Sequence, residues 1–440
     1  MKSLPTRIFL IAALLFTGLL TVAPKVIGLG IEQATIDSVL ELIPPEAGSQ
    51  FEIRRNEFSE GWFRSAATIE VIYRPIGTDA VALSMDFDID HGPLLQTQDG
   101  LKIGLAYANI TPSIRNDLFE IAVAEFEFPL PQISLNLLAR FDQSLRIAMD
   151  VKAVEYSGTQ GYVNFAGIEA SVDVNRDQSA RFALEMGELS ASEVAANSDI
   201  LVAGLSLVST TAQMNDILAA SSAALSVPVI SSTSPVPFSV SGFSINYGLQ
   251  DSPNHPQSSE IHQTLKVTNI EGELPIRSFY WQSEIKQLSD ELMRDYYRLV
   301  SKLQSEMNSD PDTVSDELGV LGQEMLLLTL QNPLEFNNLI RFNAYEGDHS
   351  ADLRMQWAGL STLGNVAELD TSAAIAALNI TLLISFDLEA VLSSPLAGLV
   401  DPYVQQGYLT VSNGRVIVEA SLQDSVLKMN GDEVALDQFF

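Results

Sequence analysis

The stretch VALSMDFDID, at residues 81–90, decides the fold of this chain. Its odd-numbered residues are apolar, and its even-numbered residues are alanine, serine or aspartate. Successive side chains of a β-strand point to opposite faces, so this period of two predicts a strand with one buried face and one wet face. The same alternation returns at residues 101–107, 145–151, 182–186 and 378–388. Because few helix-length stretches separate these segments, the sequence predicts an antiparallel meander and not parallel βαβ units.

Turn and loop signals lie between the predicted strands. In residues 238–247 the apolar positions slip by one at Gly242, which we interpret as a glycine bulge in a curved sheet. The Ser/Pro-rich stretch at 226–237 is expected to be a long loop. Near the end of the chain, the dipeptides Asn413-Gly414 and Asn430-Gly431 suit the type I′ turns of two hairpins.

One block of the chain has helical periodicity. Apolar residues step by three or four from Ile285 to Met307, and a second such run extends from Leu318 to Leu328. We interpret residues 278–332 as a helical hairpin that covers one face of the sheet. The alternative is an apolar stripe that binds a partner.

The first residues predict a membrane anchor. Residues 8–23 carry no charge, Lys2 and Arg7 precede them, and all 56 acidic residues follow them. A spanning helix needs ~20 apolar residues. The uncharged run reaches this length if the helix continues past Lys25 to Ile31, with the Lys25 amine extended to the membrane interface. The positive-inside rule then places the C-terminal part in the periplasm of a Gram-negative cell. The segments we expect are a cytoplasmic tip at 1–7, a transmembrane anchor at 8–24 and a neck helix at 25–48.

A cleaved signal peptide is the competing interpretation of the same residues. Cleavage after Thr21-Val22-Ala23 would place Pro24 directly behind the cut, with Lys25 next. That is a poor cleavage site, so a retained anchor is favoured.

The composition excludes several classes of function. The chain has 24 Lys+Arg against 56 Asp+Glu, a formal net charge of −32, so nucleic acid is not an expected partner. Anionic lipid headgroups are equally disfavoured as partners of the general surface. The acidity suits a solubility or salt adaptation, with a cationic partner or divalent ions as the alternative. Without cysteine the chain has no disulfide, thiolate metal site or cysteine nucleophile.

Several short motifs resemble the YdgA-like bacterial proteins, a family whose domain has no known function. They are GWFRS at 61–65, DHGP at 90–93, residues 396–411 and LKMNG at 427–431. The resemblance spans most of the chain, although residues 156–259 match nothing in it. It implies an inner-membrane protein that faces the periplasm, and it supplies no catalytic residue. The motif positions are candidate site residues: Gly61, Trp62, Phe63, Ser65, His91, Gly92, Pro93, Asn430 and Gly431.

Few residues suggest chemistry. Asp86, Asp88 and Asp90 with His91 could hold a divalent cation through oxygen ligands, but a calcium loop gathers more ligands, so a solvated strand face is favoured. His91 could act as a general base, yet Gly-Pro directly after a strand is typical of a turn. Trp62 and Phe63 could dip into a membrane or contact a ligand, although core packing is the usual role of such a pair. We therefore predict no catalytic residue, no metal site and no cofactor; the scattered histidines are His255, His262 and His349.

These patterns together predict an α+β protein. A single N-terminal transmembrane helix is followed by a large, curved, mainly antiparallel β-sheet domain with a covering helical hairpin, and the β-rich regions lie at 49–277 and 333–440. The function expected first is a membrane-anchored periplasmic envelope protein that binds a hydrophobic ligand such as lipid in a curved-sheet groove. A protein–protein scaffold of the envelope is the alternative, and a hydrolase with an unrecognised site is third. The expected partners are the inner membrane and a lipid or an envelope protein.

Alkaline phosphatase fused after Phe440 should be active, because that enzyme forms its disulfides only in an oxidising compartment such as the periplasm. The intact mass of the purified chain should include Met1 to Ala23. A mature chain that begins near Pro24 or Ile31 would contradict the retained anchor.

Overall fold

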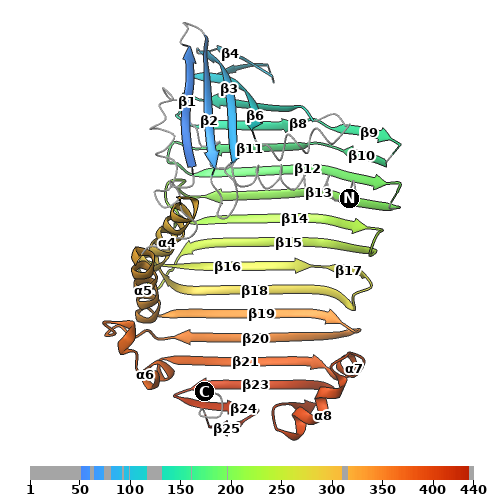
Figure 1. Cartoon of the computed structure of the whole chain (residues 1–440), viewed down its shortest axis with the longest axis vertical. Helices are drawn as coiled ribbons and strands as arrows, with labels where there is room; N and C mark the ends of the chain where they lie inside the picture. The colour runs from blue at the N-terminus through green and yellow to red at the C-terminus, as the bar shows by residue number, and fades with distance from the viewer. Residues whose placement is uncertain are drawn as a thin grey trace. The chain divides into compact units, whose positions relative to one another are not determined.

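The computed structural model describes residues 51–59, 64–73, 81–91, 94–98, 100–115, 131–159, 161–195, 197–309 and 316–435. Strands predominate in these residues (Figure 1). The chain divides into two compact units. Unit 1 comprises Met1–Pro235 and Tyr297–Leu318, and unit 2 comprises Val236–Tyr296 and Gly319–Phe440.

Unit 1 contains an antiparallel sheet in which each main strand pairs with the next along the chain. Two hairpins leave this order. In the first, β4 (Leu94–Thr97) pairs with β5 (Gly100–Ile103). In the second, β9 (Val154–Gly158) pairs with β10 (Gly161–Phe165), which also pairs with the end of β12 (Ala180–Glu193). The main strands are β1 (Phe51–Ser59), β2 (Arg64–Tyr73), β3 (Val81–His91), β6 (Ala106–Arg115), β7 (Ile133–Ala139), β8 (Leu145–Val151), β11 (Ile168–Val174), β12 (Ala180–Glu193), β13 (Ser198–Thr211) and β14 (Ser221–Ser232).

The alternating stretch at 81–90 forms β3, as predicted. Phe87 is buried between its partners Ala67 and Ile110, whereas Asp86 and Asp88 are exposed. The core of unit 1 is formed by those buried residues of the neighbouring strands that share the face of Phe87. They include Ile69, Met85, Leu137, Ile147, Val172 and Leu184. One face of this sheet is therefore dry, and the other carries most of the polar side chains.

Unit 2 contains a second run of antiparallel pairs. Within it β17 (Asn269–Gly272) pairs with the start of β15 (Phe238–Asp251), and β22 (Thr410–Ser412) pairs with the start of β23 (Arg415–Gln423). The other strands pair in chain order. They are β15 (Phe238–Asp251), β16 (Ser258–Val267), β18 (Ile276–Ser289), β19 (Leu334–Ala344), β20 (Gly347–Trp357), β21 (Leu378–Asp387), β23 (Arg415–Gln423), β24 (Val426–Met429) and β25 (Asp432–Val434).

The helices of the described residues lie between strands in the sequence. They are α4 (Asp290–Ser309), α5 (Asp316–Gln331), the short 3-10 helix η2 (Val366–Glu368), α6 (Thr371–Ala376), α7 (Leu388–Leu392) and α8 (Ala397–Gln405). The C-terminal end of α5 attaches to the end of β20, because Trp357 Nε1 donates a hydrogen bond to the carbonyl oxygen of Leu330 at 3.0 Å. The backbone N–H of Leu360 also donates to Leu330, at 2.8 Å. In Figure 1, α5 accordingly lies beside the strand ends.

The expected α+β class with a transmembrane helix is wrong. The described residues form mainly antiparallel strands. No helix in this part of the chain has the length and apolar character needed to cross a membrane. The expected tip, anchor and neck helix, at residues 1–48, lie outside the described residues.

The expected helical hairpin at 278–332 is also wrong in its first part, because β18 occupies Ile276–Ser289. Ile285 and Leu288 have a spacing that suits a helical stripe. However, Ile285 lies opposite Ile261 of β16 and Phe336 of β19. Pairing with a neighbouring strand on each side therefore stabilises a strand here, and the helix begins only at Asp290. The loop expected at 226–237 is likewise mostly strand, since β14 continues to Ser232.

The glycine bulge expected at Gly242 is absent from the pairing of β15 with β16 and β17. Ser241 lies opposite Asn269 and Ser244 lies opposite Lys266, so the register is the same on both sides. Gly242 has a φ of +62°, a left-handed conformation that glycine adopts without steric cost. A Cβ at this position would collide with the side chain of Thr268.

Gly242→Ala should lower the free energy of unfolding by roughly 1–3 kcal/mol, because alanine is strained at positive φ and meets Thr268. The matched control is Gly248→Ala in the same strand, where nothing lies within 4 Å of the added Cβ. Urea midpoints of the parent and both variants measure the difference. Equal midpoints for the two variants would contradict the role of Gly242.

Candidate functional site

The candidate positions from the sequence do not come together in one described site. Gly61, Trp62, Phe63, Gly92 and Pro93 lie outside the described residues. Ser65 is buried on β2, and its Oγ has no hydrogen-bond partner within the described part of the chain. His91 is the last residue of β3, where its backbone lies opposite Ala106.

The aspartates of β3 lie on the wet face, as predicted. Thr68 Oγ1 donates to Asp86 Oδ1 at 2.7 Å, and Arg64 Nε donates to Asp90 Oδ1 at 2.8 Å. Arg64 Nε also lies 3.6 Å from Asp88 Oδ1. The hydrogen bond with Asp90, helped by the charges of Asp88 and Asp90, raises the pKa of the Arg64 guanidinium. Side chains of β2 therefore engage all three carboxylates.

Asn430 and Gly431 form the tight turn between β24 and β25, as predicted. Their φ values are +51° and +92°, and Asn413 and Gly414 have similar values of +51° and +73°. Asn430 also acts beyond its turn: its Nδ2 donates to the carbonyl of Gly407 at 2.8 Å, and its Oδ1 accepts from the backbone of Glu419 at 2.9 Å. This asparagine therefore ties the last hairpin to the segment after α8, which is a structural role.

The three scattered histidines, His255, His262 and His349, all lie in unit 2. His262 lies 3.8 Å from Glu284 and 3.7 Å from Glu260. Burial acts to raise the pKa of Glu284, but the hydrogen bond and charge of Lys286, a hydrogen bond from Gln282 and the charge of His262 together outweigh it, so this pKa lies below its ordinary value. His349 is buried, with Nε2 2.9 Å from the carbonyl oxygen of Ala344. Among the described residues no group of three or more His, Asp or Glu side chains is arranged to hold a metal ion.

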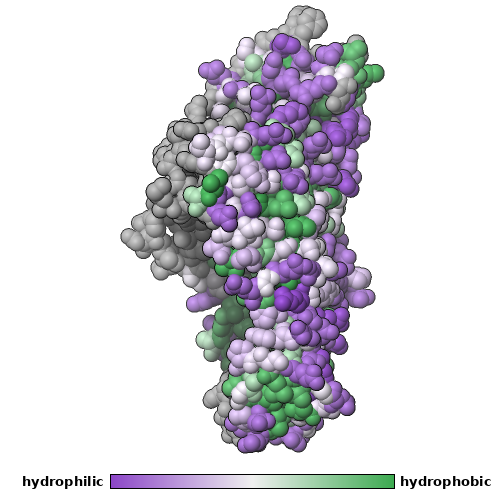
Figure 2. Space-filling view, turned by 90° about the vertical axis from the view of Figure 1, so that its right-hand side faces the viewer, coloured by the Kyte–Doolittle hydropathy of each residue, from purple (hydrophilic) through white to green (hydrophobic). Residues whose placement is uncertain are grey.

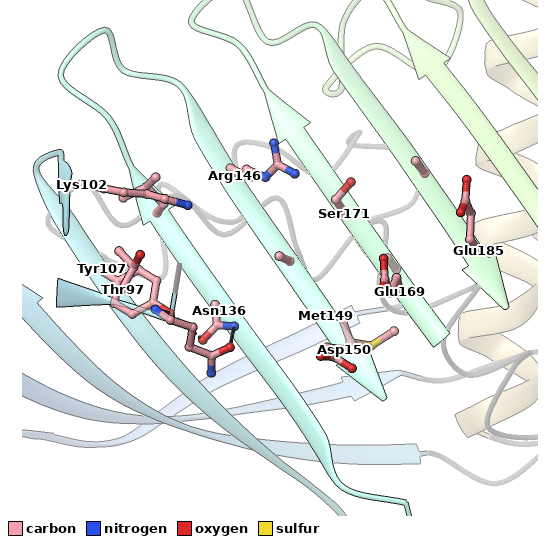
Figure 3. Close-up of a pocket in the computed structure, with 15 residues that line it drawn as sticks. Thr97, Lys102, Tyr107, Asn136, Arg146, Met149, Asp150, Glu169, Ser171 and Glu185 are labelled. Carbon is pink, nitrogen blue, oxygen red and sulfur yellow. Dashed lines mark hydrogen bonds between the residues drawn. The ribbon is translucent and has the colours of Figure 1, made fainter. Parts of the chain in front are cut away.

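A polar hollow of about 470 Å³ lies on the second face of the unit 1 sheet (Figure 3). The Tyr107 hydroxyl donates to Asn136 Oδ1 at 2.9 Å, and Asn136 Nδ2 donates to Gln98 Oε1 at 3.3 Å. These bonds connect the β4–β5 hairpin to β6 and β7. The charged side chains that line the hollow are Lys102, Arg146, Asp150, Glu169 and Glu185. Because both signs of charge are mixed there, this hollow suits water or a polar ligand and not an acyl chain.

The second face of interest is apolar and belongs to unit 2. Residues directly opposite each other in an antiparallel ladder share a face. The registers of six successive strand pairs bring one apolar residue from each of seven strands into a single row. The row consists of Ile245, Leu265, Trp281, Ile340, Ala351, Ile384 and Val418, and we call it the apolar row. A parallel row four residues along consists of Leu249, Ile261, Ile285, Phe336, Met355, Ile380 and Leu422.

Burial distinguishes the apolar row from the core of unit 1, although Leu249, Ile261 and Leu422 of the parallel row are buried. Every residue of the apolar row is only half-buried, whereas Leu137 and Leu184 in unit 1 are 1% exposed. Trp281 is held in place by a hydrogen bond from its Nε1 to Asn338 Oδ1 at 2.8 Å. The row could not be predicted from the sequence, because the apolar spacing that begins near Trp281 and Ile285 indicated a helix. The row also depends on registers between distant strands, for which a single strand carries no signal.

A separate apolar patch surrounds α8. Leu396 is 54% exposed, Leu399 49% and Tyr403 42%. Figure 2 shows this patch over α7 and α8. No lysine or arginine occurs between Arg354 and Arg415, so α7 and α8 carry no cation that would attract an anionic bilayer. The patch suits an apolar protein surface better.

Comparison with known proteins gives a family but no activity. Residues 1–437 match the family described as bacterial protein of unknown function (DUF945). No curated protein and no solved structure matches the chain.

Replacing Asp86, Asp88 and Asp90 together by asparagine should leave the calcium dependence of the Tm unaltered. These exposed carboxylates are engaged by Arg64 and Thr68, and such exposed pairs contribute only weakly to stability. The Tm of the parent and of the variant is measured with calcium and with a chelator. A calcium-induced rise in the parent that the variant lacks would restore the metal interpretation.

Proposed function

The chain belongs to this bacterial family of unknown function, and we propose that it binds a hydrophobic ligand, an acyl chain of a lipid, along the apolar face of unit 2. The observation that carries the proposal is the half-buried state of the whole apolar row from Ile245 to Val418. A closed core would bury such residues, as the core of unit 1 does. When a ligand covers the apolar area that these side chains leave in contact with water, the burial of that area favours binding.

The dimensions of the row suit acyl chains. Neighbouring strands lie ~4.8 Å apart, so the seven residues extend over about 30 Å. This matches the ~30 Å hydrocarbon thickness of a bilayer, or twice the depth of one leaflet. Each methylene that leaves water for such a surface gains ~0.8 kcal/mol. Because no residue of the row is charged, binding requires no charged headgroup site on this face.

The proposed setting is the bacterial cell envelope, at the inner membrane with the large C-terminal part in the periplasm. The support is the placement of Lys2 and Arg7 before an uncharged run that all acidic residues follow. The motifs at 90–93 and 427–431 favour the YdgA-like proteins within the family, and their resemblance implies the same compartment. The proposed partners are the inner membrane and its lipids.

A scaffold function is the second candidate, and the patch around α8 is what favours it. Leu396, Leu399 and Tyr403 expose apolar area that a partner protein from the envelope would cover. The two candidates use different surfaces of unit 2, so their tests are separate.

The detergent-extracted full-length chain should bind a fluorescent phospholipid or fatty-acid probe in a saturable way. Ile340→Asn places a polar amide in the middle of the apolar row and should weaken probe binding roughly tenfold, because one buried apolar side chain contributes ~1.5–3 kcal/mol. Leu339→Asn is the matched control: it makes the same kind of change on the same strand but on the opposite face, and it should bind like the parent.

Ala351 is replaced in a second test: Ala351→Trp blocks the apolar row with a large aromatic side chain and introduces no amide. It should also weaken probe binding, while the Tm of each variant reports that the sheet remains folded. No saturable binding by the parent, or equal binding by the Ile340 and Leu339 variants, would contradict the proposal and leave the scaffold function ahead. Lipid analysis of the purified parent shows whether a lipid copurifies.

A further inference from the structure

The opposite face of the unit 2 sheet concentrates positive charge in a hollow of about 470 Å³. Lys266, Arg341 and Arg415 line it together with one carboxylate, Asp348. The whole chain has 24 Lys+Arg against 56 Asp+Glu. Three cations around one hollow are therefore contrary to the general charge of this protein.

The strand registers explain why these side chains meet. Lys266 lies opposite Tyr280, Tyr280 opposite Arg341, and Arg341 opposite Ser350. All four residues consequently point to one face, the face opposite to that of Ile340. Two strand spacings separate the backbones of Lys266 and Arg341, which is about 10 Å. Two long side chains that start at this separation can converge on one small ligand.

Lys266 and Arg341 are both exposed. Within the described residues neither side chain makes an ion pair or a hydrogen bond, in contrast to Lys286, which pairs with Glu284 at 3.2 Å, and Arg354, which pairs with Asp352 at 2.9 Å. The charges of Lys266 and Arg341 are thus available to a ligand.

Arg415 differs because neutral acceptors hold it in place. Its Nε donates to Ser385 Oγ at 2.9 Å, its Nη2 to the Ser385 carbonyl at 3.1 Å and its Nη1 to the Asp348 carbonyl at 2.8 Å. These bonds fix the guanidinium without neutralising it. The Asp348 carboxylate opposes an anion, but it already accepts a hydrogen bond from Asn343 Nδ2 at 2.9 Å.

We propose that this hollow, which we call the cationic hollow, binds a phosphate group. A guanidinium donates two parallel hydrogen bonds to phosphate oxygens, and an ammonium adds a compact point charge. Arg341 and Lys266 supply one of each, the Tyr280 and Ser350 side chains carry hydroxyls between and beside them, and Arg415 adds a fixed charge. The acidic remainder of the surface repels anions and so restricts their binding to this hollow. Lys266 and Arg341 point to the face opposite to the apolar row, so phosphate binding does not depend on lipid binding there.

Isothermal titration calorimetry of the full-length chain tests the proposal with two probes, inorganic phosphate and monomeric dihexanoyl phosphatidylglycerol. Saturable binding of inorganic phosphate supports a free-phosphate site, and binding of the phospholipid alone supports a lipid headgroup as the source of the phosphate. Binding should weaken as salt rises, because the cations involved are exposed. No saturable heat with either probe overturns the proposal.

Arg341→Gln and Lys266→Gln should each weaken the binding roughly tenfold or more, since each removes a charge-assisted hydrogen bond. Lys428→Gln removes the same charge from β24 of the same unit, outside the cationic hollow, and should leave the affinity unchanged. Arg341→Lys should restore part of the loss, because it keeps the charge but not the paired donors. An equal effect of the Lys428 and Arg341 substitutions would show a general charge effect and would overturn the site.

Discussion

Antiparallel backbone pairing is the interaction on which the rest of this structure depends. Each ladder fixes which side chains stand beside one another, because directly opposed residues point to the same face. In unit 2 the ladders carry the apolar row from Ile245 to Val418 without interruption. A shift of one residue in a single pair would turn all side chains beyond it to the other face. The chemistry of both faces is therefore decided by register and not by any one strand.

The two units use their apolar faces differently. In unit 1 the apolar face forms a dry core, in which Leu137 and Leu184 are 1% exposed. In unit 2 the residues of the apolar row remain half-buried, so part of their hydrophobic driving force is not used in folding. A ligand that covers this area binds the folded state and not the unfolded chain, and it would therefore stabilise unit 2 by mass action. Half-burial of a long apolar row is thus a physical reason to expect a ligand.

The local features of this fold could be predicted from the sequence, whereas the features that depend on pairing could not. The period of two at 81–90 identified β3 and its wet aspartates, and Asn430-Gly431 identified a tight turn. Ile285 was assigned to the wrong element because a spacing of three is compatible with a helix, and only its partners Ile261 and Phe336 decide for a strand. The serines of β14 suggested a loop, yet Ser226 lies opposite Ser206 in a ladder. The candidate sites join strands that are far apart in the sequence, as Trp281 and Ile340 show, and no local pattern contains that information.

Ile340 and Arg341 show how one strand serves two chemistries. They are neighbours in the sequence, but the alternation of side chains places Ile340 in the apolar row and Arg341 at the cationic hollow. The backbone of the sheet separates these two side chains, and substitutions that share no partner act nearly independently. An apolar ligand on one face and a phosphate on the other can therefore bind without competing. If one lipid molecule supplied both the acyl chain and the phosphate, it would have to pass around the end of the strands. Phe342 and His349, which share the face of Ile340, also line the hollow. Separate ligands are the simpler arrangement, because each face of β19 then recognises the chemistry that its own residues favour.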